Sequence, residues 1–172
     1  MIPKAKASRA VLLPADLPHV FSVFYQGPVL MADVSRPRTD PTRFGRTGSW
    51  LVRYHRPGSA TTKGPLVIAS RVDLFKDSGG AKKDLELYRK QLGALAGSGS
   101  SIKPVRGVGA EALALVQNRS TSGPSVVTYT IVWREANATA ELDANGFAPG
   151  LTFSQTVALA RAQQRHLRSL AR

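Results

Sequence analysis

Hydrophobic and polar residues alternate along several stretches of this chain, a pattern typical of β-strands with one buried face. In residues 49–56 the alternation places Trp50, Val52 and Tyr54 on one side of a strand. Residues 65–75 repeat the pattern after a turn that contains proline and glycine. The two segments are therefore predicted to form an antiparallel hairpin.

Three more strands are predicted in the second half of the chain, over residues 111–119, 125–134 and 138–144. The loop STSGP connects the first two of these strands as a hairpin. Asn137 is predicted to turn the chain between the last two, because asparagine adopts positive φ more readily than most residues.

The hydrophobic period changes to that of a helix after residue 77. Leu85, Tyr88 and Leu92 follow helical spacing and share one face. Asp77 or Ser78 is placed to cap the start of this helix, and a run of glycine and serine ends it.

A second helix is predicted from Thr152 to about Leu170, where Thr152 and Gln155 have the spacing of a capping box. The element order lacks a repeated strand–helix–strand rhythm. It favours an α+β fold, with a mostly antiparallel sheet of about 5–7 strands and two main helices packed on it. Residues 1–9 are predicted to be a flexible arm, and residues 10–172 a single α+β domain.

The composition is that of a globular protein, with 172 residues, 42% hydrophobic and 20% charged. Its 24 basic and 11 acidic residues give a formal net charge of +13. Such a surplus favours anionic partners, among them nucleic acid, acidic polymers and anionic membrane surfaces.

Arginine is concentrated in residues 35–58, which are predicted to be a loop followed by a strand, and along one edge of the last helix. The candidate anion-binding residues are Arg36, Arg38, Arg43, Arg46, Arg53, Arg161, Arg165 and Arg168. The alternative is an ordinary solvated surface, with the helical arginines favoured by the helix dipole.

No constellation of residues indicates catalysis. The chain has no cysteine, and its three histidines lack metal-ligand spacing, so neither a metal nor another cofactor is predicted. No nucleophile elbow or phosphate-binding loop is present. Glu141 and Asp143 share a strand face and are interpreted as surface salt-bridge residues. No run approaches the 18 apolar residues of a membrane-spanning helix.

Three segments resemble parts of exported actinobacterial domains of uncharacterised function, some of them lipoproteins. They are WREANATAELDANGFAPGLTFSQTVALARAQQRHLRSL near the end, VDLFKDSGGAKKDLELYRKQL in the middle and LLPADLP near the start. The resemblance implies a secreted or lipid-anchored domain at the cell envelope, with an α/β sandwich similar to the PsbP-like fold. It supplies no catalytic residues. The sequence contains no lipobox cysteine or signal sequence, so export is implied by the resemblance alone.

Three hypotheses follow. The leading one is a non-enzymatic, extracytoplasmic binding domain whose partner is an anionic envelope polymer, a lipid head group or a protein. The alternatives are a basic nucleic-acid-binding protein, which would be cytoplasmic, and a small-molecule carrier or enzyme with a pocket between sheet and helices. The residues predicted to line such a pocket are Trp50, Tyr54, Tyr88, Tyr129 and Trp133, all of which also suit simple packing.

Overall fold

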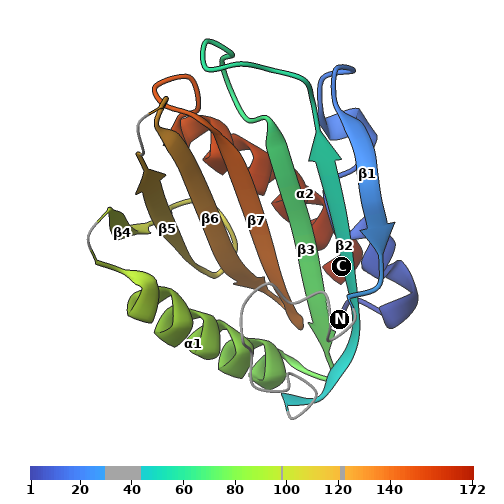
Figure 1. Cartoon of the computed structure of the whole chain (residues 1–172). Coiled ribbons are helices and arrows are strands. Elements are labelled where there is room, and N and C mark those ends of the chain that lie inside the picture. Colours follow the sequence, from blue (N-terminus) through green and yellow to red (C-terminus); the bar gives the residue numbers. More distant parts are fainter. Residues whose placement is uncertain (30–43, 98, 121–122) are drawn as a thin grey trace.

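A computed structural model describes residues 1–29, 44–97, 99–120 and 123–172. Its centre is a seven-stranded sheet in the order β1-β2-β3-β7-β6-β5-β4, and every neighbouring pair is antiparallel (Figure 1). The strands are β1 (Ser22–Gly27), β2 (Arg46–His55), β3 (Val67–Phe75), β4 (Ser100–Pro104), β5 (Glu111–Arg119), β6 (Val126–Glu135) and β7 (Ala138–Phe147). The predicted α+β fold is confirmed.

Two main helices cover opposite faces of the sheet. Figure 1 shows α1 (Ser78–Leu95) crossing one end of the near face and α2 (Phe153–Ala171) lying behind the strands. Both predicted caps are confirmed, because Asp77 accepts a hydrogen bond from the Gly80 amide and Thr152 forms a capping box with Gln155. These caps satisfy backbone N–H groups that the first helical turn leaves without partners.

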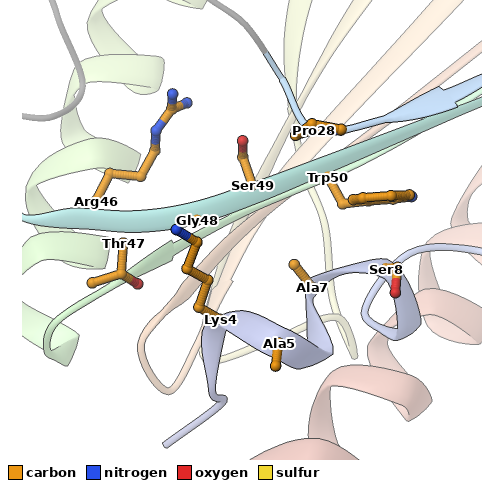
Figure 2. Close-up of a pocket in the computed structure, with 10 residues that line it drawn as sticks. All are labelled: Lys4, Ala5, Ala7, Ser8, Pro28, Arg46, Thr47, Gly48, Ser49 and Trp50. Atoms are coloured by element: carbon orange, nitrogen blue, oxygen red, sulfur yellow. The ribbon is translucent and has the colours of Figure 1, made fainter.

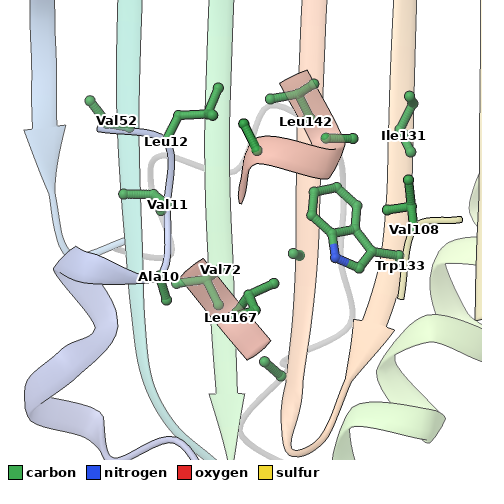
Figure 3. Close-up of a cluster of buried hydrophobic side chains, with 14 of the residues drawn as sticks. Ala10, Val11, Leu12, Val52, Val72, Val108, Ile131, Trp133, Leu142 and Leu167 are labelled. Carbon is green, nitrogen blue, oxygen red and sulfur yellow. The ribbon is translucent and has the colours of Figure 1, made fainter. Parts of the chain in front are cut away.

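The face of the sheet toward α2 carries the larger hydrophobic core. Strand alternation turns Val72, Ile131 and Trp133 toward the helix, where they are almost fully buried (Figure 3). Tyr54 belongs to the same buried cluster. From the helix side, Leu167 packs into the same cluster. The inward orientation predicted for the aromatic residues of β2 and β6 is therefore confirmed.

Two buried amides join α2 to the strands within this core. The Gln163 side chain accepts from the Ser70 hydroxyl at 2.8 Å and donates to the Arg71 carbonyl at 2.9 Å. Gln164 accepts from the Trp133 indole N–H at 2.7 Å. Buried polar groups of this kind stabilise a fold only when they are paired, so these bonds define how the helix lies on the sheet.

The predicted flexible arm over residues 1–9 is wrong. Residues 4–9 form a 3₁₀ helix, η1 (Lys4–Arg9), and Ile2 is 2% exposed within the large core. The Ile2 amide donates to the Asn137 side chain at 2.7 Å, and Asn137 donates back to the Ile2 carbonyl at 3.1 Å. The segment is held by partners that lie far away in the sequence, which a local pattern does not reveal.

One turn also differs from prediction. The residue with positive φ between β6 and β7 is Ala136, not Asn137, whose side chain is committed to buried hydrogen bonds. Near the start of the chain, a second 3₁₀ helix, η2 (Pro14–Asp16), follows η1. The Asp16 carboxylate accepts a hydrogen bond from the Leu13 amide at 2.7 Å.

Candidate anion-binding surface

The eight candidate arginines do not form one site. Arg36, Arg38 and Arg43 lie outside the described residues. Arg46 forms an ion pair at 2.9 Å with Asp73, whose side chain is 1% exposed, so its charge is used inside the fold. This arginine stabilises the sheet and is not available to a ligand.

Arg53 lies on β2, on the face of the sheet away from α2. Its guanidinium is 5.6 Å from the centre of the Tyr25 ring on the neighbouring strand β1. Arg53 therefore makes a cation–π contact on its own face of the sheet. The sheet separates it from the arginines of the last helix.

Arg161, Arg165 and Arg168 follow one edge of α2 and are all exposed. The helix lies beside the N-terminal segment on the same face of the sheet, since Gln163 donates to the Ala10 carbonyl at 3.3 Å. We call residues 1–21 and 152–172 together the basic layer. It contains seven basic residues and one acidic residue.

The only acidic residue of the basic layer, Asp16, is already paired. Its carboxylate lies 2.8 Å from His166 Nε2, an interaction that the sequence pattern did not reveal. Glu135, from β6, reaches this edge and lies 3.8 Å from the Arg168 guanidinium. Arg161 and Arg165 have no carboxylate partner within the described part of the chain.

A groove of about 490 Å³ lies between the start of α2 and the segment that joins β4 to β5. Phe153 and Val157 of α2 form its apolar side, together with Pro104 and Val105. Its basic residues are Arg106 and Arg161. Sequence analysis did not identify Arg106, because an isolated arginine in a connecting segment has no periodicity.

Arg161 is held against the groove by backbone contacts. Its guanidinium donates to the Arg106 carbonyl at 3.2 Å. It lies directly beside Gly107, which has φ of 75°, and a Cβ added at that glycine would be 3.2 Å from Arg161 Nη2. Glycine therefore serves two purposes here, since it adopts the left-handed backbone and leaves space for the guanidinium.

Another groove, of about 720 Å³, separates η1 from β2. Figure 2 shows Trp50 and Ala7 near its floor, with Lys4 reaching toward Gly48. Arg46 also borders this groove but points to the side of β2 away from η1, toward its Asp73 partner (Figure 2). Lys4 is therefore the one described lining residue with a charge directed at this groove.

Most of the aromatic residues predicted to line a pocket are packed instead. Tyr54 and Trp133 are 1% and 0% exposed in the large core. Tyr88, a residue of α1, is 3% exposed in the smaller cluster between that helix and the sheet. Trp50 borders the groove beside η1, and Tyr129 lies behind the other groove, with its ring 5.6 Å from that of Phe153. The described part of the chain therefore shows no pocket that gathers the five.

Burial also affects the ionisation of two tyrosines. Burial, with a smaller contribution from the charge of Asp16, raises the pKa of Tyr54 to about 12. The Tyr54 hydroxyl donates to the Leu12 carbonyl at 2.8 Å, which requires the neutral form. Burial also raises the pKa of Tyr129 above its ordinary value.

A charged network lies between the sheet and α1, where sequence analysis expected only surface pairs. Asp73 accepts from both Arg46 and Arg71, and the Tyr88 hydroxyl donates to Glu141 at 2.5 Å. Burial lowers the pKa of Arg71, but the charges of Asp73 and Glu141 and the hydrogen bond from Arg71 to Asp73 more than offset it, so the pKa stays above its ordinary value. The network holds α1 to the sheet.

The described residues contain neither a metal-ion cluster nor a membrane-spanning helix. No group of three or more histidine and carboxylate side chains is arranged to hold a metal ion there. No helix in those residues is long and apolar enough to cross a membrane.

Comparison with known proteins identifies the fold. No family model matches the chain, and no curated protein is significantly similar in sequence. The crystal structure of the extracellular domain of PknH from Mycobacterium tuberculosis is similar, with a TM-score of 0.72 and 11% sequence identity. The match covers 98% of this chain and 97% of that one. At this identity the similarity shows a shared fold; the likeness to a PsbP-like fold stays a prediction.

Proposed function

We propose that this chain is a non-enzymatic, extracytoplasmic interaction domain of the bacterial cell envelope that binds an anionic partner through the basic layer. The observation that carries the proposal is the charge of that layer, seven basic residues against one acidic residue that His166 already occupies. A fold shared with an extracellular domain supports the location.

The shape of the layer suits an extended partner. A helix and the adjoining N-terminal segment present their charges from one face of the sheet, and α1 on the other face has four basic and two acidic residues. Each basic residue near an anionic membrane surface contributes about 1 kcal/mol of binding free energy, so several weak contacts add to useful affinity.

The alternatives have less support among the described residues. Proteins that bind single-stranded nucleic acid stack bases on exposed aromatic rings beside basic groups. Tyr54 and Trp133 are buried in the core, so they provide no such surface. Nucleic acid nevertheless remains an arm of the test, because the net charge alone favours it.

The direct experiment measures co-sedimentation of the full chain with vesicles that contain phosphatidylglycerol, compared with vesicles of phosphatidylcholine alone. Arg9→Glu/Arg165→Glu reverses one charge in η1 and one in α2, both at exposed positions. Because this double variant changes the charge of the layer by four units, we expect at least about tenfold weaker binding to the anionic vesicles.

Lys82→Glu/Lys90→Glu is the matched control, since it makes the same charge change at exposed positions of α1 on the opposite face. Equal losses in the two double variants would mean that net charge, not the basic layer, directs binding. A duplex DNA arm at the same salt concentration tests the nucleic-acid hypothesis, which tighter DNA binding would favour over ours.

Cell fractionation tests the location separately. The natural gene product is expected in the envelope or extracellular fraction. A purely cytosolic pool would contradict the proposal, whatever the vesicles show.

A further inference from the structure

We propose that the groove between α2 and the β4–β5 connection binds a single-chain amphiphile with a phosphate head group. This inference rests on the proposed function, because it names a ligand class for one part of the basic layer. Four features of the groove carry it: an apolar wall, basic residues that line it or lie beside it, the absence of a carboxylate partner for them among the described residues, and its size.

The apolar wall is well supported from behind. Phe153 packs against the Tyr129 ring, which itself lies on a buried cluster of Val116, Val127 and Leu151. Val157, the next turn of α2, continues the wall. A hydrocarbon chain laid along this wall removes apolar surface from water and gains about 25 cal/mol per Å² buried.

Two cations line the groove, and a third lies beside its apolar wall. Arg106 and Arg161 line the groove, and the Lys103 ammonium lies 5.7 Å from the centre of the Phe153 ring. None of the three has a carboxylate partner within the described part of the chain. Their charges are therefore available to an anionic head group that is attached to the hydrocarbon chain of a ligand.

The geometry of the cations favours phosphate. Arg161 uses one N–H on the Arg106 carbonyl, which fixes the guanidinium and leaves other donors for a ligand. Two guanidinium groups and an ammonium match the two negative charges of a phosphomonoester better than the single charge of a carboxylate.

The size of the groove argues for one chain. Its volume of about 490 Å³ falls within the range of small-molecule sites, about 300–1,000 Å³. The groove is open at the surface and has a small apolar lining, which suits one alkyl chain attached to one head group.

The experiment titrates the full chain with monododecyl phosphate below its micelle concentration, using isothermal titration calorimetry. Inorganic phosphate provides the phosphate charge without the dodecyl chain, and dodecyl maltoside provides the dodecyl chain without the charge. We expect one site that binds the alkyl phosphate at least about tenfold more tightly than either reference ligand, a difference of about 1.4 kcal/mol.

Arg161→Gln removes the charge at the groove, and Arg165→Gln removes the same charge one turn further along the same edge of α2. Arg165 does not line the groove. We expect Arg161→Gln to weaken alkyl phosphate binding at least about tenfold, because hydrogen bonds to charged groups contribute more than neutral ones. Arg165→Gln should leave this affinity within about twofold. Thermal unfolding of both variants checks that they remain folded.

The two proposals fail separately. Equal effects of Arg161→Gln and Arg165→Gln, or alkyl phosphate binding no tighter than inorganic phosphate, overturn the groove assignment while vesicle binding by the basic layer still stands. Loss of the vesicle effect with intact, Arg161-dependent alkyl phosphate binding overturns the extended surface and supports the groove. Tighter binding of an acidic peptide than of the alkyl phosphate overturns the lipid assignment.

Discussion

The two helices of this protein cover the same sheet by different means. Against α2 and the N-terminal segment, the sheet presents a large apolar core with a few paired amides. Against α1 the buried cluster has six residues, three from the helix and three from the sheet, and it lies beside the ion pairs of Asp73 and the Tyr88–Glu141 hydrogen bond. Apolar contacts predominate on one side, and charged groups have a larger share on the other.

The difference separates stability from recognition. Between the sheet and α1 the nearly buried arginines are used internally, since Arg46 and Arg71 both pair with Asp73. The α2 side obtains its stability from apolar burial, so most of its arginines remain exposed on the outer surface. A surface can bind an anion only through charged groups that are not already paired within the fold.

The largest expected effect is loss of the core on the α2 side. Trp133→Ala removes a fully buried side chain and leaves the Gln164 carbonyl oxygen without its indole partner. We expect the free energy of unfolding to fall toward the upper end of the about 3–5 kcal/mol typical of such truncations. Urea denaturation measures it.

Leu92→Ala is the corresponding substitution on the other face of the sheet. Leu92 lies in α1, in the smaller buried cluster between that helix and the sheet. Its expected cost lies nearer the lower end of the about 2–5 kcal/mol range for leucine truncation. A larger loss for Leu92→Ala than for Trp133→Ala would mean that the α1 side, not the α2 side, carries most of the stability.

Asp73→Asn comes next and tests the ion pairs of the α1 side. The substitution removes the ion-pair partner that two nearly buried arginines share. We expect a loss of about 3 kcal/mol in urea denaturation, since breaking a buried pair exposes the full cost of the remaining charge.

Glu111→Gln is its control, because Glu111 pairs with Arg134 at 3.0 Å but its side chain is 38% exposed. Solvent screening limits such a pair to about 0–1 kcal/mol. If the two substitutions cost the same, the distinction between internal and exposed charges on this side is wrong.

The smallest effect concerns Tyr54 and is observed as a loss of stability only above pH 10. Its pKa rises from 10.0 to about 12 in the folded protein, so the neutral hydroxyl is favoured by folding. This contribution is fully present below pH 10 and is lost as the pH rises through 12. Comparing the pH dependence of unfolding for the native chain and Tyr54→Phe isolates it. Parallel curves between pH 10 and 12 would contradict the prediction.

Local periodicity determined much of the architecture. Alternation placed Trp50, Val52 and Tyr54 on the inner face of β2, and helical spacing with capping residues located α1 and α2. These signals are readable because strands and helices repeat over two to four residues, so neighbours in the sequence carry the information. Both helix caps are readable for the same reason, because each joins residues only three positions apart in the sequence.

Only the tertiary structure decided which residues serve the fold and which remain available. Ile2 is held by Asn137, and Asp73 takes Arg46 out of the set of candidate anion-binding residues. Arg106 joins Arg161 only because the β4–β5 connection passes beside α2. Such pairings depend on the order of strands and on which face each helix covers, and residues far apart along the chain leave no periodic trace of meeting.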